Sequence, residues 1–466
     1  EIMVFEASGH VSYGSCGLPY LISGVIPKPE DLVVYTPQFF LDKRNIRVFT
    51  HHTVTDLDPS RKQVRVRRPD GTLQDVSYDR FILTTGGRAA RPPIPGIDLP
   101  GVFTLRTLED GVAILDYLSQ RRPRQAVIVG GGYIGLEMAE AFRARGLEVA
   151  VVEMLPQVMA TLDPDMAALV AESLQRNGVA LYTGEAVTGL EGDNGGVRRV
   201  HTTGRTLEAD LVLLAGGVKP NVSLAAAAGL RLGPTGAVAV NERLETSLPD
   251  IWAAGDVAEV NHLVTGAPAY IPLGTTANKQ GRVAGENAAG GRASFGGVVG
   301  TAVAKLFDLE VARTGLTLAE AERAGFDPAT ATVKQHSRAH YYPGGAKMSV
   351  KLIIDRPSGR LLGAQMVGTD GVSKRIDVPA AALHAGWTVE ELYGLDLSYA
   401  PPFAPVWDPV LMAAREGLKA IGAIAAERGA DMLGFVFVGK SPRAIAADAT
   451  AAHALWGAPA PAPASG

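Results

Sequence analysis

The 466-residue sequence has a single cysteine, Cys16. One cysteine can form neither an internal disulfide nor a cysteine-based zinc site, so the sequence predicts a protein of the reducing cytoplasm. Long hydrophobic runs are lacking too: no stretch of 18 apolar residues occurs, which argues against a membrane span. The first residues also lack the basic segment that begins a signal peptide.

A large excess of charge is absent as well. The formal net charge is −4 and charged types make up 20% of the residues, which argues against a broad basic face for nucleic acid. Apolar types make up 47%, enough for a sizeable core, and the length predicts about three domains. The 54 glycines and 30 prolines follow no period, which excludes a collagen-like protein. We expect the alanine- and proline-rich tail, residues 421–466, to be disordered.

Short apolar runs predict the strands of a parallel sheet. They span residues 2–5, 81–85, 126–129, 147–152 and 209–214. Apolar residues at helical spacing predict helices over 133–145 and 163–176, and Asp163 is the candidate N-cap of the second helix. Uniformly apolar strands between helices indicate a parallel sheet that is covered on both faces.

A glycine-rich turn, Gly130-Gly-Gly-Tyr-Ile-Gly135, follows one of these strands and opens a helix. In such a turn, Gly130 permits the tight bend, Gly132 lets the backbone approach a pyrophosphate, and Gly135 allows the helix to pack closely on the strand. Free N–H groups at the helix start attract phosphates. Glu153 ends the next strand, where a carboxylate binds both ribose hydroxyls and repels a 2′-phosphate. The sequence therefore predicts a dinucleotide site that prefers NADH to NADPH.

Beyond residue 300 the pattern changes. The runs 349–354 and 361–367 predict antiparallel strands, and helices are predicted near 374–386 and 388–393. This order of elements predicts a separate α+β domain at the C-terminal side.

Some isolated residues allow two interpretations each. Cys16 lies among small residues, where a following helix would favour its thiolate, but a lone cysteine is more often an inert buried side chain. Asp256 ends the run Ile-Trp-Ala-Ala-Gly-Asp, which is either an ordinary turn or a piece of a second nucleotide site. His336 and His340 would share one face only on a helix; because their segment is predicted as strand and turn, we expect no metal site.

Seven short motifs occur together, in one order, within residues 1–415. They lie at residues 12–20 (Ser-Tyr-Gly-Ser-Cys-Gly-Leu-Pro-Tyr), 84–87 (Thr-Thr-Gly-Gly), 130–137, 216–220 (Gly-Gly-Val-Lys-Pro), 253–256, 277–282 and 399–403 (Tyr-Ala-Pro-Pro-Phe). As a set they resemble the single-cysteine branch of the pyridine nucleotide–disulfide oxidoreductases. This branch includes coenzyme A disulfide reductases, NADH oxidases and NADH peroxidases.

The resemblance implies an α/β fold with two Rossmann-like nucleotide-binding domains, for FAD and NAD, and a C-terminal α+β dimerisation domain. The FAD-binding domain would be formed by two separate segments, 1–104 and 222–297, on either side of the NAD-binding domain (105–221). The dimerisation domain (298–420) and the tail (421–466) would follow. The resemblance also implies that NADH, or NADPH, reduces FAD, and that reduced FAD reduces the sulfur of Cys16, held as a mixed disulfide or a sulfenic acid.

The resemblance also assigns cofactor contacts. Glu6 would bind the adenosine ribose of FAD, and Asp256 its ribityl chain. Thr85 and Gly86 would pack on FAD, and Gly274 and Thr275 would approach its flavin ring. The full set of candidate cofactor contacts is Glu6, Thr85, Gly86, Gly130, Gly132, Gly135, Glu153, Gly216, Asp256, Gly274 and Thr275.

Within the family, the segments Leu18-Pro-Tyr20 and Tyr399-Ala-Pro-Pro are similar to the coenzyme A disulfide reductases. In those enzymes, tyrosines that match Tyr341 and Tyr399 reach the cysteine of the partner subunit, which implies a homodimer with a shared active site. The alternative is that both are ordinary interface aromatics.

Three further residues are candidates for the substrate contacts. Arg44 matches a basic position of the family and would meet the phosphates of coenzyme A, unless it is only a solvated surface charge. Ser12 and Ser15 would hydrogen-bond the pantetheine or the sulfur.

Two departures from the family leave other functions open. Ser15 stands where coenzyme A reductases usually carry asparagine, and serine there resembles the oxidases and peroxidases. About 25–30 residues of the family pattern, with the glycine-rich FAD loop, are missing before Glu1, a length that suits one strand, loop and helix. The favoured function is therefore reduction of coenzyme A disulfide or a related disulfide or persulfide. The first alternative is an NADH oxidase or peroxidase that uses a cysteine sulfenate. The second is a non-catalytic fragment without flavin, since a chain without the glycine-rich FAD loop would bind FAD poorly.

Overall fold

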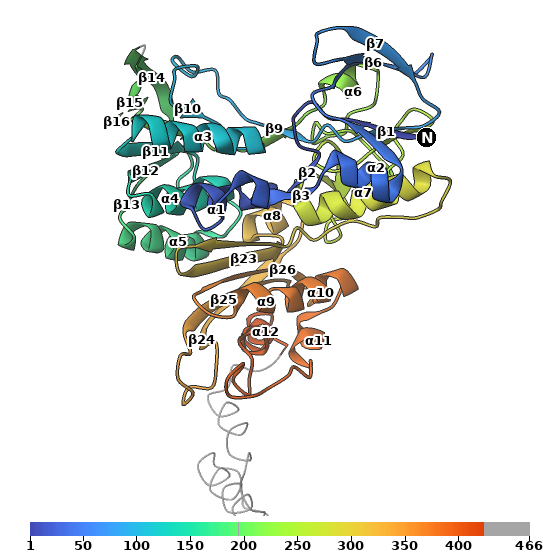
Figure 1. The fold of residues 1–466 in the computed structure, drawn as a ribbon. Helices are drawn as coiled ribbons and strands as arrows, with labels where there is room; N and C mark the ends of the chain where they lie inside the picture. Colours follow the sequence, from blue (N-terminus) through green and yellow to red (C-terminus); the bar gives the residue numbers. More distant parts are fainter. Residues whose placement is uncertain (194, 424–466) are drawn as a thin grey trace, which may run out of the picture.

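The computed structural model describes residues 1–193 and 195–423. Figure 1 shows three regions. The dinucleotide region holds the elements of residues 102–220, and the second nucleotide region, beside it, holds those of residues 2–89 and 223–288. The C-terminal region, below them, holds the elements of residues 302–420. The described residues confirm the predicted α/β fold class. The domain boundaries stay predictions, and of the predicted tail, residues 424–466 lie outside the described residues.

The dinucleotide region is built on a five-stranded parallel sheet in the order β10-β17-β11-β12-β13. Its elements are β10 (Val102–Phe103), α3 (Leu108–Arg121), β11 (Gln125–Val129), α4 (Tyr133–Ala144), β12 (Glu148–Glu153), α5 (Pro164–Arg176), β13 (Val179–Thr183), β14 (Val187–Asp193), β15 (Gly196–Thr202), β16 (Thr206–Glu208), β17 (Leu211–Leu214) and β18 (Val218–Pro220). The runs of valine, isoleucine and leucine that predicted β11, β12 and β17 are almost wholly buried, as a central parallel strand requires.

Both faces of this sheet are covered, as predicted, but by different layers. Ile128 and Val151 pack with helices α3, α4 and α5 in one core cluster. Val127 and Val152, which alternate with them, pack against Leu190 of the antiparallel sheet β14-β15-β16. The sequence analysis missed this antiparallel cover, although the Asn-Gly pair at residues 194–195 is a hairpin signal.

The second nucleotide region consists of small sheets. Its elements are β1 (Ile2–Phe5), β2 (Ser12–Tyr13), the 3-10 turn η1 (Ser15–Gly17), α1 (Leu18–Ser23), η2 (Pro29–Leu32), β3 (Val33–Tyr35), α2 (Pro37–Arg44), β4 (Ile46–Phe49), β5 (Thr53–Asp58), β6 (Gln63–Arg67), β7 (Leu73–Ser77), β8 (Phe81–Leu83), β9 (Gly87–Ala89), α6 (Ser223–Ala227), β19 (Ile251–Ala253), β20 (Val260–Asn261), β21 (Pro268–Ala269) and α7 (Gly274–Ala288). Parallel pairs β1-β4 and β8-β19 bring together segments far apart in sequence. The antiparallel ribbon β9-β18 joins this region to the dinucleotide region (Figure 1).

The C-terminal region holds a five-stranded antiparallel sheet in the order β22-β23-β26-β25-β24. Its elements are β22 (Ala302–Leu306), β23 (Leu309–Gly315), α8 (Leu318–Arg323), β24 (Pro328–His336), β25 (Lys347–Asp355), β26 (Leu361–Gly368), α9 (Val372–Arg375), α10 (Asp377–Ala385), α11 (Val389–Tyr393) and α12 (Pro409–Ala420). The predicted antiparallel strands are confirmed, and the helix predicted near 374–386 is divided into α9 and α10. One face of the sheet packs on α10 and α12 through a cluster that includes Leu352, Leu383 and Val410.

The predicted N-cap of α5 is confirmed in position, although its side chain has other partners. Asp163 occupies the N-cap position of α5, but its side chain makes no capping hydrogen bond there. Its carboxylate instead accepts a hydrogen bond from the backbone N–H of Leu318 at 3.0 Å and pairs with Lys351 at 2.9 Å. A buried ammonium group from another region of the chain competes successfully for this carboxylate.

Among residues 1–193 and 195–423, no helix combines the length and the apolar character needed to cross a membrane. Over the same described ranges, no three His, Cys, Asp or Glu side chains are grouped so that they could hold a metal ion.

Candidate active site

The glycine-rich turn lies between β11 and α4, at the carboxyl edge of the parallel sheet. Gly130 has φ of +115°, and a Cβ there would lie 2.4 Å from the carbonyl oxygen of Ala215. A Cβ on Gly135 would lie 2.1 Å from the carbonyl oxygen of Gly130, so the helix packs here without a side chain. A Cβ on Gly132 would meet nothing within 4 Å. The turn is thus closed on the protein side and open at Gly132, where a phosphate group could approach the backbone.

Glu153 ends β12 beside this turn. One carboxylate oxygen accepts the N–H of Gly131 at 2.7 Å, and the other accepts the N–H of Leu155 at 2.8 Å. Each oxygen keeps a second lone pair, so the carboxylate can still accept hydrogen bonds from ribose hydroxyls. Gly216 follows β17 and is exposed at the same edge of the sheet. The structure therefore brings the predicted dinucleotide residues together.

Cys16 is exposed and lies in η1, directly before α1. A helix does follow the cysteine, since α1 begins at Leu18. Leu18 and Leu21 are buried in the core cluster of the dinucleotide region, so α1 carries the cysteine against that region. Ser15 precedes Cys16 and is exposed, and Ser12 lies in β2.

Tyr20 follows Cys16 by four residues and lies on α1, which packs against α4. Burial raises the pKa of Tyr20, and the carboxylate of Glu137 adds to this shift. Burial also raises the pKa of Glu137 to about 7, and Glu140 adds to the shift. A glutamate that titrates near neutrality in such a position is a candidate functional residue. Glu137 ends the motif at residues 130–137, but no local pattern indicates its burial, because α1 packs against α4 from a distant part of the chain.

Arg106, directly before the N-cap of α3, joins Asp256 to Gly87. Its guanidinium pairs with the carboxylate of Asp256, and its Nε donates to the carbonyl oxygen of Gly87 at 3.3 Å. Glu109, in the first turn of α3, accepts the N–H of Gly9 at 3.2 Å. Gly9, a few residues before the cysteine segment, and Asp256 therefore both contact the start of α3, at one corner of the site. Sequence reasoning missed Arg106, since no motif marks it.

The residues at this corner fit the flavin end of FAD. The hydroxyl of Tyr270 is buried without a hydrogen-bond partner among the described residues. Burial raises the pKa of Tyr270 to about 12, with a contribution from Asp256, so the hydroxyl stays protonated and can donate to a ligand. Helix α7 begins at Gly274 without a side-chain cap, Thr275 beside it is exposed, and a Cβ on Gly274 would meet nothing within 4 Å. An uncapped, open helix start supplies free N–H groups to a ligand.

The other predicted FAD contacts lie on the same region. Glu6 follows β1 and accepts the N–H of Ser8 at 2.7 Å. The hydroxyl of Thr85 donates to the carbonyl oxygen of Asn221 at 2.8 Å, and Gly86 has φ of +66° with open space at its Cβ position. The Gly-x-Gly-x-x-Gly motif of this sequence, at Gly130, belongs to the dinucleotide turn. The predicted FAD contacts described here match the flavin end and the ribose carboxylate of an FAD site.

Tyr341 and Tyr399 lie together on the C-terminal region, in loops 58 residues apart in sequence. Their hydroxyl oxygens are 3.1 Å apart, and this hydrogen bond raises the pKa of Tyr399. The two side chains are 64% and 46% exposed. Among the interactions of the described residues, none joins this pair to Cys16 of the same chain.

Arg44 is exposed in the last turn of α2, next to Lys43. Neither cation forms a side-chain hydrogen bond or ion pair with another residue of the described chain, so both can meet an anionic ligand.

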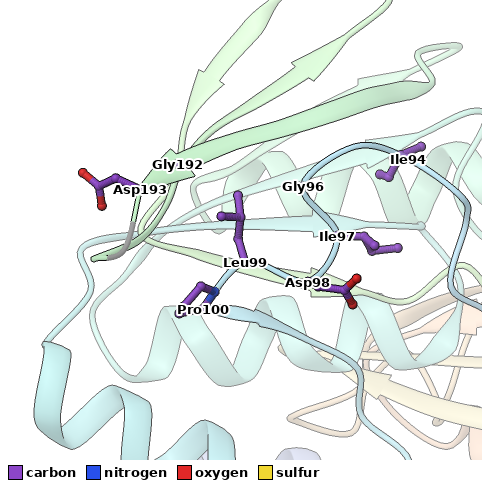
Figure 2. A pocket seen from close by; sticks show the side chains of 8 residues that line it. All are labelled: Ile94, Gly96, Ile97, Asp98, Leu99, Pro100, Gly192 and Asp193. Carbon is purple, nitrogen blue, oxygen red and sulfur yellow. The ribbon is translucent and has the colours of Figure 1, made fainter.

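A cavity of about 570 Å³ lies elsewhere, between the segment before β10 and the end of β14. Figure 2 shows its eight lining residues, among them Leu99 and the carboxylates of Asp98 and Asp193. None of the predicted site residues lines it, so this cavity is separate from the candidate active site.

An exposed cysteine before a helix that packs on the dinucleotide region, together with residues suited to a flavin, is typical of a pyridine nucleotide-dependent redox protein. The chain belongs to the pyridine nucleotide-disulphide oxidoreductase family. The family model of that description matches residues 1–281, and the model of its dimerisation domain matches residues 301–409. The family uses FAD and NAD(P)H.

Curated relatives support this assignment over most of the chain. An NAD(P)H sulfur oxidoreductase (CoA-dependent) of Pyrococcus furiosus is 42% identical over 89% of this chain and 92% of its own. An NADH oxidase of Methanocaldococcus jannaschii is 39% identical over 90% and 93%, and a coenzyme A disulfide reductase of Staphylococcus haemolyticus 31% identical over 88% and 92%. The structure of a NAD-dependent persulfide reductase from A. fulgidus has a TM-score of 0.86, with 42% identity over 89% of this chain and 78% of that one.

Proposed function

We propose that the protein reduces coenzyme A disulfide, or a related disulfide or persulfide, with electrons from NAD(P)H and through Cys16. The observation that carries this proposal is that the sole cysteine is exposed and directly precedes α1, the helix that packs against α4 after the glycine-rich turn. The relatives named for persulfide and coenzyme A disulfide reduction support the substrate class.

In the proposed step, the thiolate of Cys16 attacks one sulfur of the disulfide substrate. A bond forms between Cys16 and that sulfur, the substrate S–S bond breaks, and one thiolate leaves and takes up a proton. When bound, FAD supplies the two electrons, received from NAD(P)H, that reduce the mixed disulfide to the Cys16 thiolate and a second thiol.

NADH is the preferred donor in this proposal. The turn at Gly130, Gly132 and Gly135 would hold the pyrophosphate, and Glu153 would accept hydrogen bonds from the adenosine ribose, with Gly216 at the edge of the site. A 2′-phosphate beside the fixed carboxylate of Glu153 would meet like charge.

The proposed FAD contacts are those that the family pattern implies. Glu6 would bind the adenosine ribose, Asp256 the ribityl chain, Thr85 and Gly86 would pack on the cofactor, and Gly274 and Thr275 would approach the flavin ring.

We further propose a homodimer with shared active sites. Tyr341 and Tyr399 would approach Cys16 of the partner subunit, where a phenol can donate the proton that the leaving thiolate takes up. Arg44 would pair with the phosphates of coenzyme A, while Ser12 and Ser15 would hydrogen-bond the pantetheine or the sulfur. The reducing cytoplasm suits a free thiol of this kind.

The direct test measures NADH oxidation with coenzyme A disulfide as the acceptor, in the wild-type protein and in Cys16→Ser. We expect disulfide-dependent oxidation by the wild type and its loss in the variant, with NAD⁺ affinity unchanged. An intact rate in Cys16→Ser would exclude Cys16 as the redox centre.

NADH oxidase activity is the second candidate, because a relative of that name is 39% identical and Ser15 resembles the oxidases. Stoichiometric consumption of oxygen or peroxide with NADH, without any response to coenzyme A disulfide, would favour an oxidase or peroxidase. The yellow absorption of bound flavin in the purified protein distinguishes both enzymes from the third candidate, a flavin-less fragment.

A further inference from the structure

A row of buried polar side chains crosses the sheet of the C-terminal region. Arg313 on β23, Gln365 on β26 and Lys351 on β25 are direct cross-strand neighbours, so they share one face of the sheet. They are only 8%, 1% and 6% exposed. The residues that alternate with them, such as Ala364 and Leu352, belong to the apolar core on the opposite face. Buried charge on this scale requires partners from the element packed against it.

Arg313 pairs with Glu320 of α8, whereas the partners of Lys351 and Gln365 come from the start of α5, in the dinucleotide region. The ammonium group of Lys351 lies 2.9 Å from the carboxylate of Asp163 and 2.7 Å from that of Asp165. The side-chain oxygen of Gln365 accepts the backbone N–H of Asp163 at 2.8 Å. Asp163 is 3% exposed, and its second oxygen accepts the N–H of Leu318. The C-terminal sheet therefore fixes both the backbone and the side chain of Asp163.

The nine residues before Asp163 form a loop, residues 154–162, that returns to the glycine-rich turn. The N–H of Met159 donates to the carbonyl oxygen of Gly131 at 2.8 Å, and the side chain of Gln157 donates to the carbonyl oxygen of Leu162 at 2.9 Å. Met159 and Leu162 are 1% and 2% exposed. At the other end of the loop, Glu153 accepts the N–H of Gly131. The segment from Glu153 to Asp163 thus binds both the backbone N–H and the carbonyl oxygen of Gly131.

The surface of this loop next to Glu153 is apolar and open. Met154 is 70% exposed and Leu155 is 42% exposed, an arrangement that an adenine base could cover. The position of the loop therefore bears on the adenosine half of a dinucleotide as well as on its pyrophosphate.

We infer that Lys351 is a positioning residue for NAD(P)H, which acts from the dimerisation domain through Asp163 and the 154–162 loop on the glycine-rich turn. This inference rests on the proposed dinucleotide site. Lys351 does not itself contact the dinucleotide. It holds one end of the loop whose other end carries Glu153, and small displacements of such groups weaken binding strongly.

The test compares binding of NAD⁺ and of ADP-ribose, measured by titration calorimetry, in the full chain and in the double variant Asp163→Asn/Lys351→Met. The double change removes both charges, so it leaves no bare carboxylate at position 163 and preserves side-chain volume. We expect about tenfold weaker binding of both ligands, with the KM for the sulfur substrate and kcat unchanged. Equal loss of ADP-ribose and NAD⁺ places the effect on the adenosine half.

The matched control is Lys305→Met. Lys305 forms another ion pair between the two regions, with Glu140 of α4 at 2.5 Å, but it does not touch the 154–162 loop. We expect unchanged NAD⁺ affinity in this control. A loss equal to that of the double variant would show that general docking of the regions matters and would overturn the inference.

A milder variant keeps the inference testable if the double variant fails to fold. Asp165 is half-exposed, and Asp165→Asn removes only the second partner of Lys351. We expect NAD⁺ to bind about two- to threefold more weakly, and unchanged affinity would contradict the inference. Because NAD⁺ and ADP-ribose binding needs no sulfur substrate, the result stands even if the proposed reductase activity is absent.

Discussion

Replacing Glu137 by glutamine should stabilise the protein at alkaline pH and have no effect at acid pH. Glu137 lies on α4, facing the segment that carries Tyr20, and its burial raises the pKa of the carboxyl group to about 7. The ordinary value for an exposed glutamate is 4.5. Between about pH 4.5 and about pH 7 the folded protein holds a proton on Glu137 that the unfolded chain releases. The contribution of Glu137 to the free energy of unfolding therefore falls over this range and is constant above it.

The size of this effect follows from the shift in the pKa of Glu137. A difference of about 2.5 pK units corresponds to about 3 kcal/mol of unfolding free energy above pH 7. Glutamine has the shape of the protonated acid and carries no charge at any pH. The variant Glu137→Gln should therefore be more stable than the wild type by up to about 3 kcal/mol at pH 8 and equally stable at pH 4.

Denaturant unfolding at pH 4, 6 and 8 measures this difference. Glu172→Gln is the matched control, because Glu172 is exposed on the neighbouring helix α5 and should show no pH-dependent difference. A stability gain of the same size at pH 4 and pH 8, or no gain at pH 8, would refute the assignment of a buried, protonated carboxyl group to Glu137.

Three further variants test the candidate active site. Glu153→Ala should shift the NADH/NADPH preference towards NADPH by about tenfold, whereas an unchanged ratio of kcat/KM values would show that Glu153 does not contact the ribose. Tyr341→Phe and Tyr399→Phe should slow turnover by about tenfold to a hundredfold, and dimerisation measured by light scattering should persist; normal turnover would exclude proton donation by these hydroxyls. Gly132→Ala should fold normally, since its Cβ meets open space, but should bind NAD⁺ at least about tenfold more weakly. Calorimetry that shows unchanged NAD⁺ affinity would contradict a pyrophosphate at Gly132.

The elements of the fold that are strongly periodic in sequence were predictable. The buried runs that form β11, β12 and β17 and the glycine-rich turn at Gly130 contain local information that is sufficient to identify them. Local patterns also predicted the antiparallel C-terminal strands, because turn residues separate their apolar runs.

The contacts between regions could not be predicted. The partner of Asp163 is Lys351, 188 residues away, and the partner of Asp256 is Arg106, 150 residues away. Neither pairing has a local signal, because each depends on the packing of domains that fold from distant segments. For the same reason the burial of Glu137 and the contact between Tyr341 and Tyr399 became visible only in the structure.

The central claim is that Cys16 exchanges electrons with a disulfide substrate. The most direct measurement is the intact mass of the protein after incubation with coenzyme A disulfide in the absence of NADH. We predict that the mass increases by one coenzyme A thiol per chain, that peptide mapping places it on Cys16, and that NADH releases it from the flavin-loaded protein. An unmodified Cys16, or an adduct that NADH leaves in place, would contradict this role of the cysteine.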